Sequence, residues 1–500
     1  MPSVDERTVA EGGGGWNARP LLAADRGGFI DRHGLWDQAQ YAAAGQLRRV
    51  VDELGLEMVR FSFADQHGVL HGKTLTRAAL SAALRSGVTA PSSLLLKDTS
   101  GRSAFGVFSA DTGVGVDGFA GAGDVVMVPD PSTFRVLPWA PRTGWVLCDL
   151  RFPDGSRVPF CGRTMLRAQL GRLADAGYAM TVGVELEFHV FRCDETTMTP
   201  DRTGVPGAPG RAPRVGPVST GSQLLLEDGL DRLDGLVQDL QRGLHAVDLP
   251  LRSVELEFGP NQLEITLQHA DAARAADDVV LARSAVRQIA RRSGHHATFM
   301  ARPAGANGAS AGWHLHQSLR DVRTGEAAFD DPSVLRAYLG GLLAHAPGAA
   351  AFTMPTVNGY KRYRAFSLAP DRICWGNDNK GAMVRVVGEA QDTGVRLENR
   401  AGEPAANPYL YIASQVISGL DGLRRGLDPG DPVTDPYAAD APALPGSLAG
   451  AVDALVADPV FAEALGPEVV AWYARLKRDE FARYLAHVSD WEQREYFDLF

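Results

Sequence analysis

Alternating apolar and polar positions predict several strands along the chain. Residues 57–63 (EMVRFSF) alternate in this way, the turn-forming residues 65–68 (DQHG) follow, and residues 69–75 have the pattern of a returning strand. A helix is predicted over residues 78–85, and residues 145–150 (WVLCDL) have the composition of another strand. These elements predict a small unit of strands and helix that ends near residue 150.

Helical periodicity dominates the rest of the chain. It predicts helices over residues 164–176, 231–246, 272–292 and 333–346, and a helical tail from residue 445 with Pro and Gly breaks. Residues 1–46 are rich in Gly, Ala and Asp, which predicts a flexible N-terminal extension. The Pro- and Gly-rich residues between 194 and 221 predict a mobile surface loop.

Two predicted strand regions carry carboxylates on one face. In residues 183–190 (GVELEFHV), alternation places Glu185 and Glu187 together, opposite a row of apolar side chains. Residues 253–268 predict a hairpin that presents Glu255 and Glu257 on its first strand and Glu264 on its second. A solvated strand face would explain any one of these patterns, whereas neighbouring carboxylates that face inward require a cation or a proton between them.

Two further strands repeat the design with other ligands. His314 and His316 share one face of residues 313–316 (WHLH), and Glu398 lies between Arg396 and Arg400 on one face of residues 395–400. Four strands of this kind favour a shared, metal-lined cleft over four surface patterns. Several carboxylates, an imidazole and no thiolate suit Mg²⁺ or Mn²⁺ better than zinc or copper.

Cationic side chains gather in the same part of the chain. Arginine forks bind phosphate and carboxylate in a bidentate way, so their combination with divalent cations indicates phosphoryl transfer on or near a carboxylate. The cluster comprises Lys361, Arg362, Arg364, Lys380, Arg385, Arg396 and Arg400. For any single arginine, surface pairing with the acidic excess is the alternative. The GxxxxGK[ST], GxGxxG, GxSxG and HExxH motifs do not occur, so metals and arginines would have to hold the phosphates.

Composition narrows the possible partners. The chain has 500 residues, of which 50 are Lys or Arg and 60 are Asp or Glu, giving a formal net charge of -10. It has no strongly basic domain, so we expect neither a nucleic acid nor a membrane partner. The 4 cysteines have no metal-type spacing and are interpreted as free thiols of a reducing compartment. With no signal-peptide pattern and no membrane-length apolar run, a cytoplasmic protein is expected.

A series of motifs resembles the glutamine synthetase superfamily in sequence and order. They are residues 182–191 (VGVELEFHVF), 257–264 (EFGPNQLE), 312–319 (GWHLHQSL), 358–362 (NGYKR) and 396–409 (RLENRAGEPAANPY). The resemblance begins near residue 57 and implies an α+β fold: a small β-grasp domain over 47–155, then a catalytic domain over 156–500 with a curved antiparallel sheet and flanking helices. It also implies a homo-oligomer, typically a dodecamer of two hexameric rings with active sites between subunits.

The resemblance also implies roles for individual residues. The first metal site would be Glu187, Glu257 and Glu264, and the second Glu185, His314 and Glu398. Arg362 and Arg400 match catalytic arginines that bind glutamate and stabilise the transition state, with Glu264 and Ser310 also at the substrate. The nucleotide would contact His316, Ser318, Lys380 and Arg385. The implied reaction uses ATP and Mg²⁺ or Mn²⁺ to form γ-glutamyl phosphate, which an amine or ammonia then captures.

Three departures from the family pattern concern the substrates. Leu368 stands where ammonia-using enzymes have a flap glutamate, Ala309-Ser310 replaces an Asn-Gly pair, and residues 91–98 (PSSLLLKD) replace a segment that carries an ammonium-binding aspartate. A pocket without carboxylates no longer favours NH₄⁺ and offers apolar surface to an organic amine. We therefore expect a γ-glutamyl-amine ligase, akin to the polyamine-ligase relatives. The alternatives are an ammonia-using glutamine synthetase and an inactive binding or structural relative.

Overall fold

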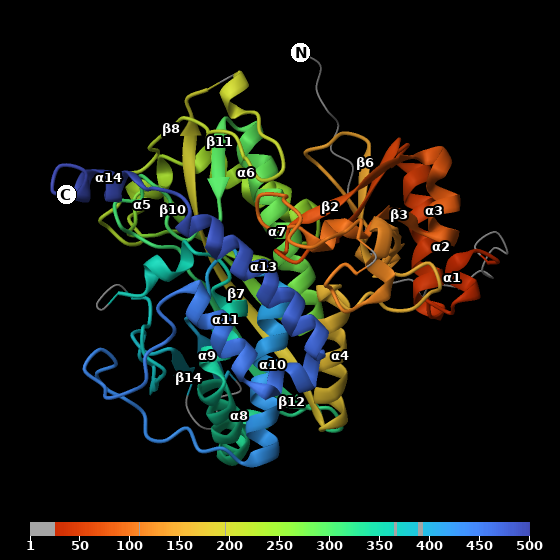
Figure 1. The fold of residues 1–500 in the computed structure, drawn as a ribbon. Coiled ribbons are helices and arrows are strands. Elements are labelled where there is room, and N and C mark those ends of the chain that lie inside the picture. Colours follow the sequence, from red (N-terminus) through yellow and green to blue (C-terminus); the bar gives the residue numbers. More distant parts are fainter. Residues whose placement is uncertain (1–25, 110, 196, 365–367, 389–393) are drawn as a thin grey trace.

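The computed structural model describes residues 26–109, 111–195, 197–364, 368–388 and 394–500, and these form two units, each built on its own sheet (Figure 1). Within the described residues, the N-terminal unit contains three α-helices and six strands. They are α1 (Phe29–Arg32), α2 (Gln38–Glu53), β1 (Met58–Ala64), β2 (Leu70–Thr76), α3 (Leu80–Ser86), β3 (Val88–Pro91), β4 (Asp124–Pro129), β5 (Arg135–Val136) and β6 (Thr143–Arg151). The strand order is β2-β1-β6-β4-β3, and β5 also pairs with β6.

The larger unit is built on a nine-stranded sheet. Its strands are β7 (Tyr178–Cys193), β8 (Val215–Gly216), β9 (Leu251–Leu256), β10 (Gln262–Asp271), β11 (His295–Thr298), β12 (Trp313–Asp321), β13 (Trp375–Asn377), β14 (Val384–Val387) and β15 (Arg396–Asn399). Their order is β13-β14-β15-β12-β7-β10-β9, with β8 and β11 also paired to β7. All these pairs are antiparallel except β13 with β14, so the predicted antiparallel sheet is confirmed.

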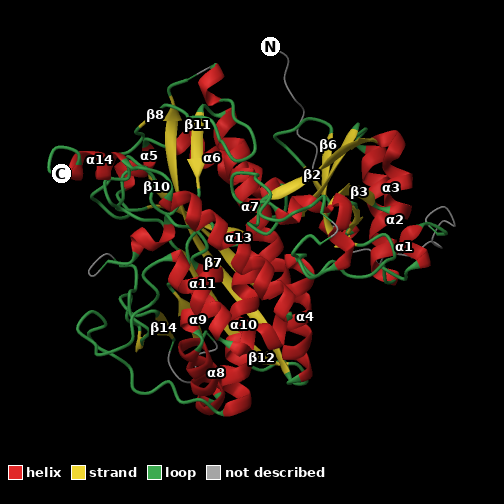
Figure 2. Cartoon of the chain, viewed as in Figure 1, coloured by secondary structure: helices red, strands yellow, loops and turns green. Residues whose placement is uncertain are grey.

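The larger unit also contains a series of α-helices (Figure 2). They are α4 (Gly162–Asp175), α5 (Glu227–Asp231), α6 (Asp234–Ala246), α7 (Ala272–Arg292), α8 (Pro332–Ala344), α9 (Ala346–Thr353), α10 (Pro408–Arg425), α11 (Leu448–Ala457), α12 (Pro459–Leu465), α13 (Pro467–Leu485) and α14 (Asp490–Tyr496). The even-numbered side chains of β7 from Val182 to Val190 pack in the same buried core as apolar residues of α6, α7 and α10. This packing leaves the odd-numbered positions of β7 for the opposite face.

Residues 26–46 correct the prediction of a flexible extension up to residue 46. They contain α1 and most of α2, and Trp36 donates a hydrogen bond from Nε1 to the Pro129 carbonyl at 2.8 Å. Asp37 begins α2 with a capping box that includes Gln40, and the buried positions of the helix recur at helical spacing. The high Gly and Ala content concealed this amphipathic pattern. Residues 1–25 lie outside the described residues.

Two other predictions about secondary structure can be compared with the structure. The helix predicted over residues 333–346 ends at Ala344, and α9 begins at Ala346 with Pro347 in its first turn, because proline cannot continue a helix.

Within the 194–221 loop, the buried carboxylate of Glu195 forms ion pairs with Arg202, Arg211 and Arg214. The exposed residues of this segment confirm a surface position.

The two units share buried contacts. A single core cluster combines residues of the N-terminal sheet with residues of α9, α11 and α13. Trp472 of α13 stacks on Phe160 with ring centroids 4.3 Å apart and donates a hydrogen bond to the Leu95 carbonyl at 2.8 Å. The N-terminal unit is therefore packed against the C-terminal helices of its own chain. Among the described residues, no helix combines the length and apolar character needed to cross a bilayer.

Candidate active site

Strand register places the predicted metal ligands side by side. Glu187 on β7 is the direct partner of Glu264 on β10, and Glu185 is the direct partner of His314 on β12. On the next strand, His316 of β12 is paired with Glu398 of β15. Side chains of directly paired residues lie on the same face of a sheet. The four strands thus bring their polar faces together, as the sequence predicts.

Two groups of these side chains are compact enough to hold a metal ion. Ligand atoms of Glu185, His314 and Glu398 lie within 4.8 Å of one another, and so do those of Glu187, Glu264 and His314. Carboxylate oxygens with one imidazole nitrogen fit Mg²⁺ or Mn²⁺. Glu257, expected in the first site, follows the end of β9 and lies outside the compact groups, although its charge raises the pKa of Glu187.

Burial shifts the pKa values of the groups in the cluster in different directions. Burial, with the Glu257 charge, raises the pKa of Glu187 to about 7, and burial together with neighbouring carboxylates raises that of Glu264 to about 10. Burial, reinforced by Arg400, lowers the pKa of His314 to about 4, which leaves the neutral imidazole that metal binding requires. Burial works against ionisation of Glu185, but hydrogen bonds to His314 and His316 outweigh it and lower the Glu185 pKa.

Glu187 is held by neutral donors in addition to its charged neighbours. Its Oε2 accepts hydrogen bonds from the Gly312 amide at 2.8 Å and from Gln262 Nε2 at 2.7 Å. Gln262 Nε2 also donates to the Ser310 carbonyl at 3.2 Å, which ties the predicted substrate loop to the metal cluster. A Cβ on Gly312 would lie 2.6 Å from Arg362 Nη2, so any larger residue at position 312 would displace the end of the Arg362 side chain.

The two predicted catalytic arginines border this cluster. Arg400 donates from Nη1 to Glu398, and Arg362 donates from Nη1 to the Ala401 carbonyl at 3.1 Å and to the Gly402 carbonyl at 2.5 Å. Both side chains are buried, and both charges lower the pKa of Glu187. Two guanidinium groups therefore lie beside a carboxylate cluster that can bind cations.

The predicted nucleotide residues occupy the neighbouring part of the sheet. His316 lies 2.9 Å from Glu185 through Nε2 and accepts a hydrogen bond at Nδ1 from Arg396 at 3.1 Å. Arg385 donates from Nη1 to Glu398 at 2.9 Å. Ser318 lies two positions beyond His316 on β12, paired with Thr181 at a half-buried position.

Lys380 is the most open of the predicted nucleotide residues. It lies in the connection between β13 and β14 and is exposed. Its charge lowers the pKa of Glu257, although burial keeps that pKa above its usual value. Lys380 is therefore close enough to influence the cluster electrostatically.

The departures from the family pattern at Leu368 and in residues 91–98 can also be located in the structure. Leu368 has a positive φ of 60° and an exposed fraction of 49%, and the preceding residues 365–367 lie outside the described residues. Asp98, in the segment that replaces the ammonium-binding one, forms an ion pair with Arg483 at 2.9 Å.

Two polar residues of this region were not predicted as site residues. Gln262 lies in the predicted hairpin of residues 253–268 and bridges Glu187 and Ser310. Glu403 is fully buried, accepts hydrogen bonds from Thr356, and has its pKa raised to about 7 by burial despite the opposing charge of Arg362. Glu403 lies in an irregular segment after β15, so no periodicity indicates which way its side chain points. Its place in the 396–409 motif is the one sequence feature that could have indicated a site residue.

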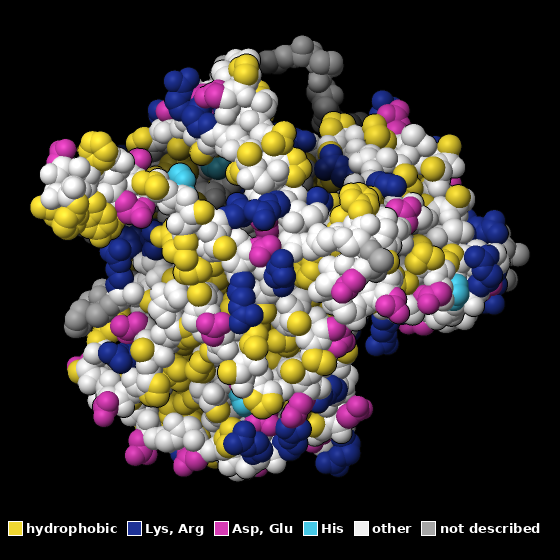
Figure 3. Space-filling model, in the orientation of Figure 1, with side chains coloured by type: hydrophobic (Ala, Val, Ile, Leu, Met, Phe, Trp, Pro, Cys, Tyr) yellow, Lys and Arg dark blue, Asp and Glu magenta, His cyan; other side chains and the backbone are white. Residues whose placement is uncertain are grey.

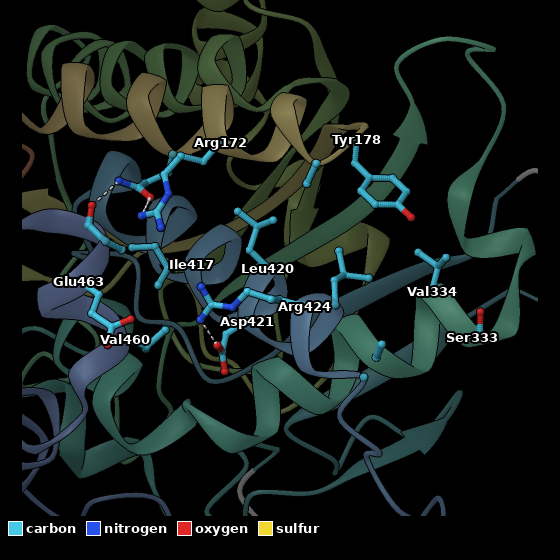
Figure 4. A pocket seen from close by; sticks show the side chains of 16 residues that line it. Arg172, Tyr178, Ser333, Val334, Ile417, Leu420, Asp421, Arg424, Val460 and Glu463 are labelled. Carbon is cyan, nitrogen blue, oxygen red and sulfur yellow. Dashed lines mark hydrogen bonds and ion pairs between the residues drawn. The ribbon is translucent and has the colours of Figure 1, made fainter.

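A cavity of about 640 Å³ lies elsewhere, between α4, α8, α10 and α12 (Figure 4). Arg172 and Arg424 face it across an apolar floor that includes Ile417 and Leu420. Arg424 is paired with Asp421 and Arg172 is hydrogen-bonded to Gln169. None of the predicted site residues lines this cavity, so the candidate active site is the polar face of the sheet.

The fold and the acidic cluster fit a carbon–nitrogen ligase, and comparison with known proteins identifies the family. The model of the glutamine synthetase catalytic domain matches residues 159–496. The chain belongs to the glutamine synthetase family, so the resemblance, the fold class and the ligase class predicted from the sequence are confirmed.

Individual relatives are named as synthetases of γ-glutamyl amides or of glutamine. A γ-glutamylanilide synthase of Acinetobacter sp is 43% identical over 494 residues, covering 94% of this chain and 99% of that enzyme. The γ-glutamylethanolamide synthetase GlnA4 of Streptomyces coelicolor is 32% identical, covering 91% and 95%. A glutamine synthetase of Halobacterium salinarum is 34% identical, covering 75% and 84%. The solved structure of GmaS without ligand has a TM-score of 0.75 at 29% identity, covering 90% and 99%.

Proposed function

We propose that this chain joins L-glutamate to an organic amine and consumes ATP to form a γ-glutamyl amide. The observation that carries the proposal is Leu368, a half-exposed apolar side chain where ammonia-using members have a carboxylate. Relatives named as γ-glutamylanilide and γ-glutamylethanolamide synthetases support an organic amine. The ammonia-using alternative has support from relatives named glutamine synthetase, at 34% identity or less. All the predicted metal ligands and both predicted catalytic arginines are present, which argues against an inactive relative.

The reaction has two steps. An oxygen of the substrate γ-carboxylate attacks the γ-phosphorus of ATP, the bond to the bridging oxygen breaks, and ADP leaves. The amine nitrogen then attacks the acyl carbon of γ-glutamyl phosphate, phosphate leaves with the bonding electrons, and the nitrogen loses a proton. The two ligand clusters that share His314 would hold divalent cations, which would neutralise charge on the phosphate and carboxylate oxygens of the substrates.

The side chains of the chain itself contribute binding and charge. Arg362 and Arg400 are proposed to bind glutamate and to stabilise the charge on the transferring phosphoryl group, which bidentate guanidinium groups do well. Arg385, His316, Ser318 and Lys380 are proposed to hold the nucleotide. Glu398 already binds Arg385 and Arg400, so one carboxylate orients both a nucleotide residue and a catalytic residue.

The proposal includes assembly into a homo-oligomer, in two hexameric rings with active sites between subunits. An apolar C-terminal end supports such contacts, since exposed apolar side chains gather on and beyond α14 (Figure 3). Those with large exposed fractions are Trp491, Phe497, Leu499 and Phe500. Extended apolar surface of this kind marks protein–protein contacts. Sedimentation equilibrium of the purified protein tests this part of the proposal, and a monomeric species at micromolar concentration would contradict it.

The test of the chemistry is phosphate release from ATP with the purified protein, L-glutamate and Mg²⁺ or Mn²⁺. Ammonium, ethanolamine, alkylamines, polyamines and aromatic amines are compared, with products identified by mass spectrometry. We expect a γ-glutamyl amide of an organic amine, with little glutamine. Glutamine as the main product would support the ammonia-using alternative, and no turnover with any nucleophile would support an inactive relative.

A further inference from the structure

His189 is a buried imidazole on the site face of β7 without a hydrogen-bond partner among the described residues. Its exposed fraction is 0%, and neither Nδ1 nor Nε2 meets a donor or acceptor there. A neutral imidazole offers one hydrogen-bond donor and one acceptor, and neither is satisfied by the described residues. Buried polar groups without a partner are destabilising and rare in folded proteins, which makes this arrangement unusual.

The neighbour of His189 on the adjacent strand also has a buried polar atom without a hydrogen-bond partner among the described residues. Gln262 is its direct partner on β10, has an exposed fraction of 1%, and its Oε1 also has no partner among the described residues. Directly paired residues have Cβ atoms about 4.5–5.5 Å apart on one face of the sheet. The residues that carry the unsatisfied imidazole and the unsatisfied amide oxygen are therefore direct neighbours on one face of the sheet, and both are buried.

The amide nitrogen of Gln262, in contrast, has two hydrogen-bond acceptors. Its Nε2 donates both to Glu187 and to the Ser310 carbonyl. If the amide turned over, Oε1 would face the acceptor Glu187 and both hydrogen bonds would be lost. The orientation of this one side chain thus connects the metal cluster to the Ala309-Ser310 loop.

We propose that His189 is a positioning residue that holds the Gln262 amide through a buried water molecule bound between the imidazole and Oε1. A water molecule can accept a hydrogen bond from the protonated ring nitrogen and donate one to Oε1. Alternatively, it can donate one hydrogen bond to the unprotonated ring nitrogen and one to Oε1. Either arrangement satisfies two of the three unpaired atoms. Through Gln262, His189 orders Glu187 and Ser310 at the acid-substrate end of the site. This role rests on the proposed function, because it takes glutamate to bind there.

The test separates a positioning role from a structural one. His189→Phe keeps an aromatic ring beside Phe191 but removes both nitrogens, and His189→Asn retains a donor and an acceptor. We expect His189→Phe to raise the glutamate KM about 10-fold, with kcat and the amine KM changed far less, and His189→Asn to restore most of the loss. His296→Phe, on neighbouring β11 and half-buried, is the matched control and leaves the glutamate KM unchanged.

Glutamate binding measured by calorimetry without any amine keeps this proposal distinct from the amine assignment. A weaker affinity in His189→Phe supports the positioning role whichever nucleophile the enzyme uses. Equal loss in all kinetic constants, or an unchanged glutamate affinity, would overturn it. If His189→Phe does not fold, a high-resolution crystal structure of the native protein decides: a water between His189 and Gln262 is expected, and a direct protein partner for both groups contradicts the proposal.

Discussion

Glu187 and Glu264 face each other as directly paired residues across β7 and β10, with His314 within reach of both. Burial, with the charge of Glu257, raises the pKa of Glu187 to about 7, and burial, with the charge of Glu187 and other carboxylates, raises that of Glu264 to about 10. Two buried carboxylates that cannot easily both be charged form a site whose ionised state needs a cation. This relationship links the stability of the fold to metal and to pH.

We therefore expect the metal-free protein to lose stability as pH rises. A carboxyl with a raised pKa in the folded state contributes stability that is complete below its unfolded pKa of 4.5 and is lost as pH rises through the folded values of about 7 and about 10. Thermal unfolding across this window, with EDTA or with Mg²⁺, measures the effect. The increase in Tm on adding Mg²⁺ should grow with pH, and a Tm gain that is independent of pH would contradict the assignment.

Removing a carboxylate from the cluster should abolish metal-dependent ATP consumption. Glu187→Ala and Glu264→Ala each delete a proposed ligand, and we expect a loss of at least about 100-fold in glutamate-dependent phosphate release. Assembly, measured by sedimentation, should stay the same because both side chains lie within the sheet face of one chain. Glu463→Gln, at the separate cavity, serves as the control. Normal turnover in both alanine variants would refute the metal assignment.

Leu368→Glu should shift the enzyme toward ammonia. A carboxylate at this position restores a group that attracts NH₄⁺ and accepts a proton, while it places a charge against an organic amine substituent. We expect the ratio of kcat/KM for ammonium to that for the preferred amine to rise about 10-fold or more. Leu368→Gln has similar size without the charge and should leave the ratio nearly unchanged. A similar shift in both variants would mean that volume, and not charge, sets the preference.

Arg283 should stabilise the contact between the N-terminal unit and the loop after β15. It is buried in α7 and donates to the carbonyls of Pro404 and Ala406 at 2.9 and 2.8 Å, and to that of Gly68 at 3.1 Å. Arg283→Met would leave these acceptors unpaired, so we expect a loss of about 3 kcal/mol or more in the free energy of unfolding. Urea denaturation measures this loss.

Hydrogen exchange distinguishes a local effect of Arg283→Met from general destabilisation. Protection should fall first around residues 65–68 and 403–407, the two segments that Arg283 connects. Arg283→Lys retains the charge but lacks the fork that reaches both segments, so its loss should be intermediate. Uniform loss of protection over the whole chain would contradict a specific role at this contact.

The sequence by itself determined the faces of the strands and much of the helical structure. Alternation with a period of two is a local property, so Glu185 and Glu187, or His314 and His316, could be assigned to one face without knowledge of neighbouring strands. The helix over residues 272–292 was predicted with the bounds that α7 has. The amphipathic α2 was missed because its Gly- and Ala-rich surroundings weakened the pattern.

The tertiary structure alone decided which groups meet and what their environment does to them. Pairing of β7 with β10 and β12 joins residues that lie far apart in sequence, and hydrogen-bond register sets these distances. The raised pKa of Glu264 follows from burial beside other carboxylates, and the unsatisfied pair of His189 and Gln262 follows from cross-strand neighbourhood. Local periodicity predicts the direction of a side chain, but only packing fixes its partners and its solvation.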